Sequence, residues 1–135
     1  GQVLQNRPSS PCGRSSPAVV ADAAARRLLF FGGGDHCTPV GNTYADTWEF
    51  DLSTNSWSEI LATENAPHRW GAYGWLFQGD LWVYGGNDHR NNTYSSASAS
   101  VWRLDLSSSP ASWAQMAQGP PRSETLDDNV PVTLE

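Results

Sequence analysis

The chain contains two copies of the same pattern, one after the other, and this internal repeat constrains the fold more than any other feature. Residues 28–36 read LLFFGGGDH, and residues 81–89 read LWVYGGNDH. Residues 48–53 return at 102–107 with a tryptophan, an aspartate and a serine in the same places, and Trp57 is matched by Trp113. The spacing changes only between these stretches, as expected when rigid elements alternate with connections that tolerate insertions. A period of about 50 residues is typical of repeat architectures.

Each repeat is predicted to form four short strands separated by turn residues. The predicted strands are residues 17–21, 28–32, 47–51 and 56–60 in the first repeat, and 70–77, 80–86, 101–105 and 113–115 in the second. Gln78 and Gly79 have the length and the glycine of a tight hairpin turn, and residues 51–55 have the Asp, Ser and Asn of another turn. The apolar residues occur in short bursts without a long helical period, so we expect an all-β fold.

Taken in order, these residues resemble the kelch motif, whose repeats form the blades of a β-propeller. That motif has an arginine before the first strand, a di-glycine closing the second, an aromatic residue and an aspartate in the third, and a tryptophan in the fourth. The matching residues here are Arg14 and Arg69, Gly32–Gly33 and Gly85–Gly86, Trp48/Asp51 and Trp102/Asp105, and Trp57 and Trp113. The resemblance covers residues 14–122 and implies blades of four antiparallel strands. It also implies that the tryptophans pack between blades and that the glycines allow backbone angles and close contacts closed to other residues.

The repeat also divides the chain into segments. We expect an arm at residues 1–13, one blade at 14–66, a second blade at 67–119, and the start of a further repeat or a linker at 120–135, where Arg122 is a third blade-entry arginine. Propellers close with about four to eight blades, and two blades alone leave apolar faces and strand edges uncovered. The expected architecture is therefore an incomplete part of a closed propeller, completed by further blades in the same or another chain.

Two Asp-His pairs are candidate contact residues. Asp35–His36 and Asp88–His89 both follow a di-glycine, so we expect them in equivalent loops on one face of the propeller. Asp and His can bind a divalent metal or a polar ligand. The structural alternative is that each Asp accepts hydrogen bonds from the backbone of its own turn while His is exposed to solvent.

The arginines at the blade entries, Arg14 and Arg69, are further candidate contacts. A guanidinium group suits the carboxylates of an acidic partner, because it can donate two parallel hydrogen bonds. The alternative for both is a structural role in packing and hydrogen bonding to neighbouring loops.

Cys12 and Cys37 are the only cysteines, and they favour a disulfide over free thiols or a metal site. A bridge would close a loop of about 25 residues and stabilise the fold by about 3 kcal/mol in the chain-entropy model. Asn91 begins a glycosylation sequon in the long polar stretch 87–100. Together they favour a secreted or luminal location over a cytoplasmic one.

Charge and motif content limit the function classes. The net charge is −6 over 135 residues, with no lysine and no basic cluster, which is unlike proteins that bind nucleic acids or anionic membranes. No apolar run approaches the roughly 20 residues needed for membrane insertion. No catalytic set, phosphate-binding loop or set of four zinc ligands is present, so no cofactor is expected. The sequence favours a non-catalytic module that binds protein through inter-strand loops or serves as a scaffold. The alternatives are part of a propeller-based enzyme of the galactose-oxidase-like or specifier type, or an extracellular carbohydrate-binding propeller.

Overall fold

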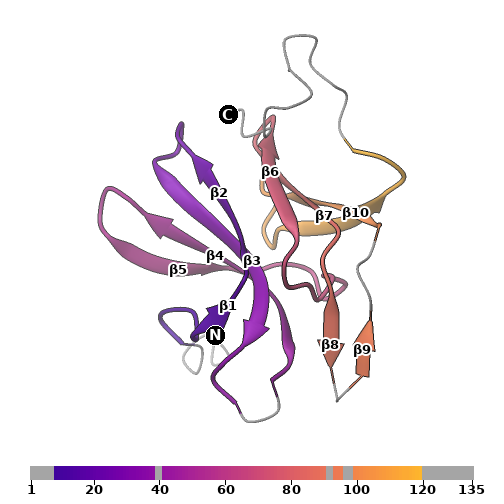
Figure 1. Cartoon of the computed structure of the whole chain (residues 1–135). Coiled ribbons are helices and arrows are strands. Elements are labelled where there is room, and N and C mark those ends of the chain that lie inside the picture. Colours follow the sequence, from indigo (N-terminus) through magenta and orange to yellow (C-terminus); the bar gives the residue numbers. More distant parts are fainter. Residues whose placement is uncertain (1–7, 39–40, 91–92, 96–98, 120–135) are drawn as a thin grey trace.

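The first repeat folds as an antiparallel sheet in which the main strands pair in chain order (Figure 1). A computed structural model describes residues 8–38, 41–90, 93–95 and 99–119. The strands of this sheet are β1 (Arg14–Ser15), β2 (Ala18–Asp22), β3 (Arg27–Asp35), β4 (Thr43–Asp51) and β5 (Ser56–Ile60). Strands β2 to β5 form an up-and-down meander, and the short β1 pairs with the last residues of β3.

The second repeat builds the same meander. Its strands are β6 (Tyr73–Phe77), β7 (Asp80–Tyr84), β10 (Val101–Asp105) and β11 (Ser112–Met116), paired in the order β6-β7-β10-β11. The described part of the chain contains no helix, so the predicted all-β fold is confirmed. It follows that the described residues include no helix long and apolar enough to cross a membrane.

The eight predicted strands are confirmed, with differences at their ends. The predicted strand 70–77 begins only at Tyr73, after Gly71 with a φ of 73°. The predicted strand 80–86 ends at Tyr84, before Gly85 and Gly86, whose φ values are 73° and 91°. Strand β3 instead continues past its di-glycine to Asp35.

The polar connection at residues 87–100 contains secondary structure that the sequence did not indicate. Strands β8 (Asp88–Arg90) and β9 (Thr93–Ser95) pair as a small antiparallel hairpin. The hairpin has little apolar content, which is why hydrophobic periodicity did not reveal it.

Predicted turn residues end several strands. Gln78 and Gly79 form the two-residue connection between β6 and β7, both with positive φ. The carboxylate of Asp51 accepts a hydrogen bond from the Ser53 amide at 2.8 Å, which closes the turn between β4 and β5. Both turn predictions are confirmed.

The hydrophobic core lies between the two sheets. Its buried residues alternate along the strands with residues of the opposite face, and they are Ala18, Val20, Leu29 and Phe31 from the first sheet and Leu76, Leu81, Val83, Leu104, Ala111 and Trp113 from the second. The rings of Phe31 and Trp113 meet across the interface with centroids 4.9 Å apart. Strands β2 and β6 lie side by side where the two sheets converge (Figure 1). Gly74 permits this approach, since a Cβ there would lie 3.0 Å from the side chain of Val20.

The outer face of the first sheet is also aromatic. Residues opposite each other in neighbouring strands share a face, and Phe30 lies opposite both Val19 and Trp48, as Phe50 lies opposite Trp57. The Trp57 ring is 4.9 Å from the rings of Phe30 and Phe50, while Val19 is exposed. Trp48 and Trp57 therefore lie on the face turned away from the second sheet.

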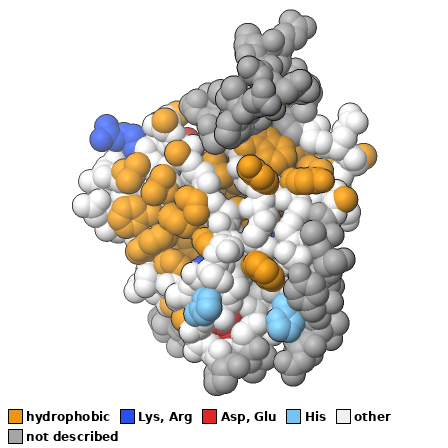
Figure 2. All heavy atoms as spheres, in the orientation of Figure 1, with side chains coloured by type: hydrophobic (Ala, Val, Ile, Leu, Met, Phe, Trp, Pro, Cys, Tyr) orange, Lys and Arg blue, Asp and Glu red, His pale blue; other side chains and the backbone are white. Residues whose placement is uncertain are grey.

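The second sheet has an apolar outer face of its own. Trp75 and Trp82 stack with centroids 6.2 Å apart, beside Tyr73 and Tyr84, which are 69% and 45% exposed. Figure 2 shows hydrophobic side chains gathered in patches over both sheets. Of the tryptophans that the sequence assigned to contacts between blades, Trp102 and Trp113 contact the core between the sheets.

Candidate functional site

The loops that carry the two Asp-His pairs meet at one end of the sheets. His36 follows β3, and His89 lies in β8, yet both line one cavity of about 200 Å³. The other lining residues are Ser15, Gly34, Asp35, Gly41, Asn42, Thr43 and Trp70. The structure thus brings three of the four residues of the pairs to one small cavity between the repeats.

Asp35 is engaged within its own loop. Its carboxylate accepts hydrogen bonds from the Cys37 amide at 2.7 Å, from the Tyr44 hydroxyl at 2.7 Å, and from the amide and hydroxyl of Thr38. These donors, the Thr38 hydroxyl first, lower the pKa of Asp35 to about 2. Burial, together with the bond to Asp35, raises the pKa of Tyr44 to about 12. Asp35 is therefore a charged residue that orders the turn after β3.

The second pair has different partners. Asp88 forms an ion pair with Arg90, with distances of 2.6 to 3.1 Å. The backbone of His89 is held by the Thr43 hydroxyl, which accepts from the His89 amide at 2.8 Å and donates to its carbonyl at 3.0 Å. The first repeat thereby fixes the position of the β8–β9 hairpin of the second.

Arg14 is almost completely used by contacts within the first repeat. Its side chain is 9% exposed and donates two hydrogen bonds to Asp46, at 2.6 and 3.2 Å. It also donates to the Gly32 and Cys12 carbonyls and lies 3.9 Å from the centre of the Tyr44 ring. Arg14 therefore has a structural role in this conformation.

Asp46 is a key residue that the sequence reasoning missed. Besides Arg14, it accepts a hydrogen bond from the Trp48 indole Nε1 at 2.8 Å. The signal was present, because Asp46 stands two residues before a motif tryptophan. It was overlooked because the corresponding residue of the second repeat, Ser100, is not acidic.

Arg69 has few side-chain partners compared with Arg14. It donates to the His68 carbonyl at 2.8 Å and to the Ser100 hydroxyl at 3.3 Å, while its Nε has no acceptor among the described residues. Burial lowers the pKa of Arg69. The sequence equivalence of Arg14 and Arg69 is therefore not an equivalence of environment.

The backbone of Arg69 joins the repeats. Its amide donates to the Tyr44 carbonyl at 3.1 Å, and its carbonyl accepts from the Gly33 amide at 2.8 Å. Gly32 has a φ of 70°, and a Cβ at this position would clash with the Arg69 carbonyl oxygen. The first di-glycine thus provides space for the entry segment of the second repeat.

Cys12 and Cys37 lie at disulfide distance, with their Cα atoms 6.1 Å apart. This link would join the segment before β1 to the loop after β3, next to Asp35. The sequon residue Asn91 and Arg122, which the sequence predicted to be a third blade-entry arginine, lie outside the described residues, as does the segment 120–135.

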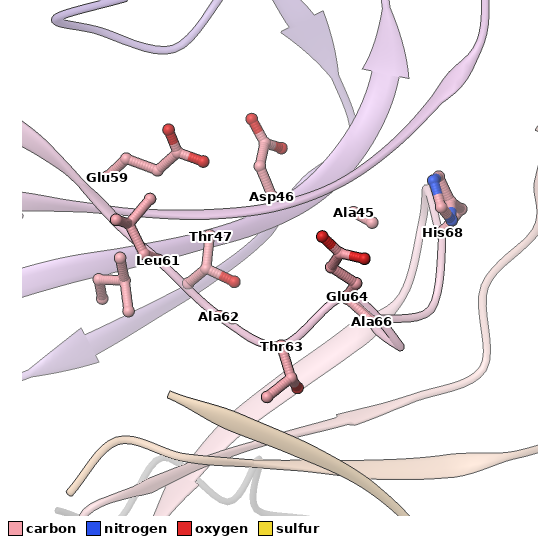
Figure 3. A pocket seen from close by; sticks show the side chains of 11 residues that line it. Ala45, Asp46, Thr47, Glu59, Leu61, Ala62, Thr63, Glu64, Ala66 and His68 are labelled. Carbon is pink, nitrogen blue, oxygen red and sulfur yellow. The ribbon is translucent and has the colours of Figure 1, made fainter. Parts of the chain in front are cut away.

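A second hollow of about 350 Å³ lies between β4, the end of β5 and the following connection. Figure 3 shows the carboxylates of Asp46, Glu59 and Glu64 around it, with His68 at one side. Burial, with the nearby charge of Arg90, lowers the pKa of His68. No group of three or more His, Cys, Asp or Glu side chains in the described part of the chain is arranged to hold a metal ion.

No protein-family model matches the sequence, and no curated protein matches it. Among solved structures, the chain is similar to the structure of YjhT, with a TM-score of 0.55 and 14% sequence identity. The match covers 84% of this chain and 54% of that one, so the chain spans about half the length of the structure it resembles. At this identity the likeness concerns the fold alone.

Proposed function

We propose that the chain contributes two adjacent blades to a kelch-type β-propeller and acts as a non-catalytic binding module. Each repeat forms a four-stranded antiparallel meander, and the strands that begin the two meanders, β2 and β6, are the ones that approach each other. This arrangement is what neighbouring blades require, because propeller blades converge on a central axis.

The outer faces of the two sheets support the propeller part of the proposal. Tyr73 is 69% exposed and Tyr84 is 45% exposed, next to two stacked tryptophans. Exposed aromatic faces of this kind are typical of surfaces that another element covers. We propose that further blades, in the same or another chain, pack on them.

Oxidative footprinting of the protein tests this packing. If further blades cover the face, Tyr73 is labelled much more slowly than its exposure in these two sheets implies. Thr54 lies in an exposed turn, and a tyrosine introduced there by Thr54→Tyr gives the rate of an uncovered side chain. Equal labelling rates for the two tyrosines would contradict the proposal.

The observation that carries the binding function is the convergence of both repeats on one cavity. His36 and His89 come from different repeats and line the same 200 Å³ cavity, beside Trp70. Loops held by a rigid sheet scaffold are the usual location of binding residues. We propose that this end of the sheets contacts a protein partner.

Site-specific photo-crosslinking in cells that make the protein tests the contact surface. A crosslinker at His36 is expected to capture a specific protein whose yield falls when His89 is replaced by alanine. A crosslinker at Thr54, in the turn between β4 and β5, is the matched control. Equal capture at both positions, or turnover of a substrate by the protein, would contradict a binding module that uses this end of the sheets.

The cysteine pair supports a location outside the cytoplasm. Cys12 and Cys37 lie at disulfide distance, and disulfides persist in oxidising compartments. We propose that the protein is secreted or luminal. Thiol alkylation before and after reduction, on protein from its native source, checks this, since free thiols in the untreated protein would count against it.

A further inference from the structure

The two repeats can be compared residue by residue through their strand pairing. Trp48 lies opposite Phe30 in the first sheet, and Trp102 lies opposite Val83 in the second, at the same place in the pattern. Two residues earlier stand Asp46 and Ser100.

The first repeat has a complete three-residue cluster. Asp46 accepts two hydrogen bonds from Arg14 and one from the Trp48 indole, at 2.6 to 3.2 Å. One carboxylate therefore satisfies a guanidinium group and an indole N–H together. Asp46 keeps 24% of its side chain exposed, so the position that its carboxylate occupies borders solvent.

The second repeat has the donors of this cluster without the acidic residue. Arg69 and Trp102 correspond to Arg14 and Trp48, but Ser100 replaces the aspartate. Trp102 Nε1, the counterpart of the indole that bonds Asp46, is buried and has no acceptor in the described part of the chain. Arg69 Nε is likewise buried without an acceptor there, whereas the Nε of Arg14 donates to the Cys12 carbonyl. Buried donors without partners are rare and costly in folded proteins.

We propose that Arg69 and Trp102 form a binding site for a carboxylate group supplied from outside the repeat. A planar guanidinium with an adjacent N–H matches two carboxylate oxygens, as Asp46 shows in the first repeat. The negative charge of Asp88 near Arg69 is balanced by its ion pair with Arg90. The site depends only on contacts within this chain, so it stands independently of the proposed propeller and of its partner.

The indole signal of Trp102 in ¹H–¹⁵N NMR of the full chain gives a direct readout. The signal is assigned by its loss in W102F. Titration with acetate is expected to shift it in a saturable way, whereas sodium chloride at matched ionic strength leaves it unchanged. A short peptide with one central glutamate, capped at both ends, forms the second arm. Saturation by the peptide at a concentration at least tenfold lower than acetate would identify a peptide side chain as the natural source, and similar concentrations would identify a free carboxylate.

Two variants make the test specific. In S100D the acceptor is supplied internally, so the Trp102 signal should already be shifted and should no longer respond to acetate. D46S gives the first repeat the composition of the second, so the Trp48 indole should gain a response. The proposal is overturned if neither acetate nor the peptide shifts the wild-type Trp102 signal, or if the shift is equally large in S100D.

Discussion

Replacing Ser100 with aspartate should stabilise the protein, although the substitution adds a negative charge to a chain that already carries a net charge of −6. The reason is local. Arg69 Nε and Trp102 Nε1 are buried donors without acceptors among the described residues, and the Ser100 hydroxyl already lies 3.3 Å from the Arg69 guanidinium. A carboxylate at this position would replace that hydroxyl as acceptor for the Arg69 guanidinium and would also accept from Trp102 Nε1, as Asp46 accepts from the Arg14 guanidinium and the Trp48 indole in the first repeat.

The size of the effect follows from the number and kind of bonds gained. A hydrogen bond that involves a charged group contributes about 1.5–3 kcal/mol, and the new carboxylate must be partly removed from water. We expect a net gain of about 2 kcal/mol in the free energy of unfolding. For a chain of this length, that corresponds to a rise in Tm of roughly 6–8 °C.

Urea denaturation of wild type, S100D and S100N measures the gain. Asparagine has nearly the same shape as aspartate but no charge, and it should yield less than half of the stabilisation. The advantage of S100D over S100N should disappear at acidic pH, where the introduced carboxyl group is protonated. If S100D is no more stable than S100N at neutral pH, the two donors do not lack an acceptor and the reasoning fails.

Three other perturbations have clear expected outcomes. Because the pKa of Asp35 is lowered to about 2 in the folded state, its stabilising contribution is complete above about pH 4 and is lost as the pH falls towards 2. Measured by ¹³C NMR, the Asp35 pKa should rise in Thr38→Ala. A wild-type pKa near 4 would be incompatible with the described loop. Gly32→Ala should lower the free energy of unfolding in urea by about 3 kcal/mol or more, because the new Cβ meets a backbone carbonyl at positive φ. The control Gly13→Ala, with open space around it, should change this free energy by less than about 0.5 kcal/mol. Equal effects would refute the close approach at Gly32. Cys12→Ser should lower the free energy of unfolding by about 3 kcal/mol. A reducing agent should lower the stability of the wild type to the same level without affecting the variant. A wild type whose stability does not change on reduction would show that the bridge contributes little.

The strand pattern could be predicted from the sequence because it occurs twice in the chain, once in each repeat. Residues 56–60 and 101–105 are strands with the predicted bounds, since Asp, Ser and Asn mark where these strands begin or end. The ends were less predictable where glycine intervenes. The di-glycine of the first repeat lies inside β3, because β1 pairs with the residues that follow it, whereas the di-glycine of the second repeat ends β7.

The candidate site was less predictable than the fold, because the comparison of repeats that predicts the fold does not predict the site. Comparison of repeats highlights residues that recur, such as Arg14 and Arg69, and hides those that differ. The contacts of the two arginines are set by Asp46 in one repeat and Ser100 in the other. Likewise, the meeting of His36 and His89 at one cavity depends on how the two sheets pack, which no local pattern encodes.

The backbone bonds of Arg69 show that a sequence repeat and a self-sufficient structural block are not the same segment here. In the first repeat, the Gly33 amide donates to the Arg69 carbonyl, and the Tyr44 and Ser16 carbonyls accept from the amides of Arg69 and Gly71. Residues 69–71 belong to the next repeat by sequence. A repeat cut out at its sequence boundary would leave those groups to water. Gene duplication or protein engineering that adds or removes a repeat would therefore have to carry the entry segment of the following repeat along with the sheet it completes.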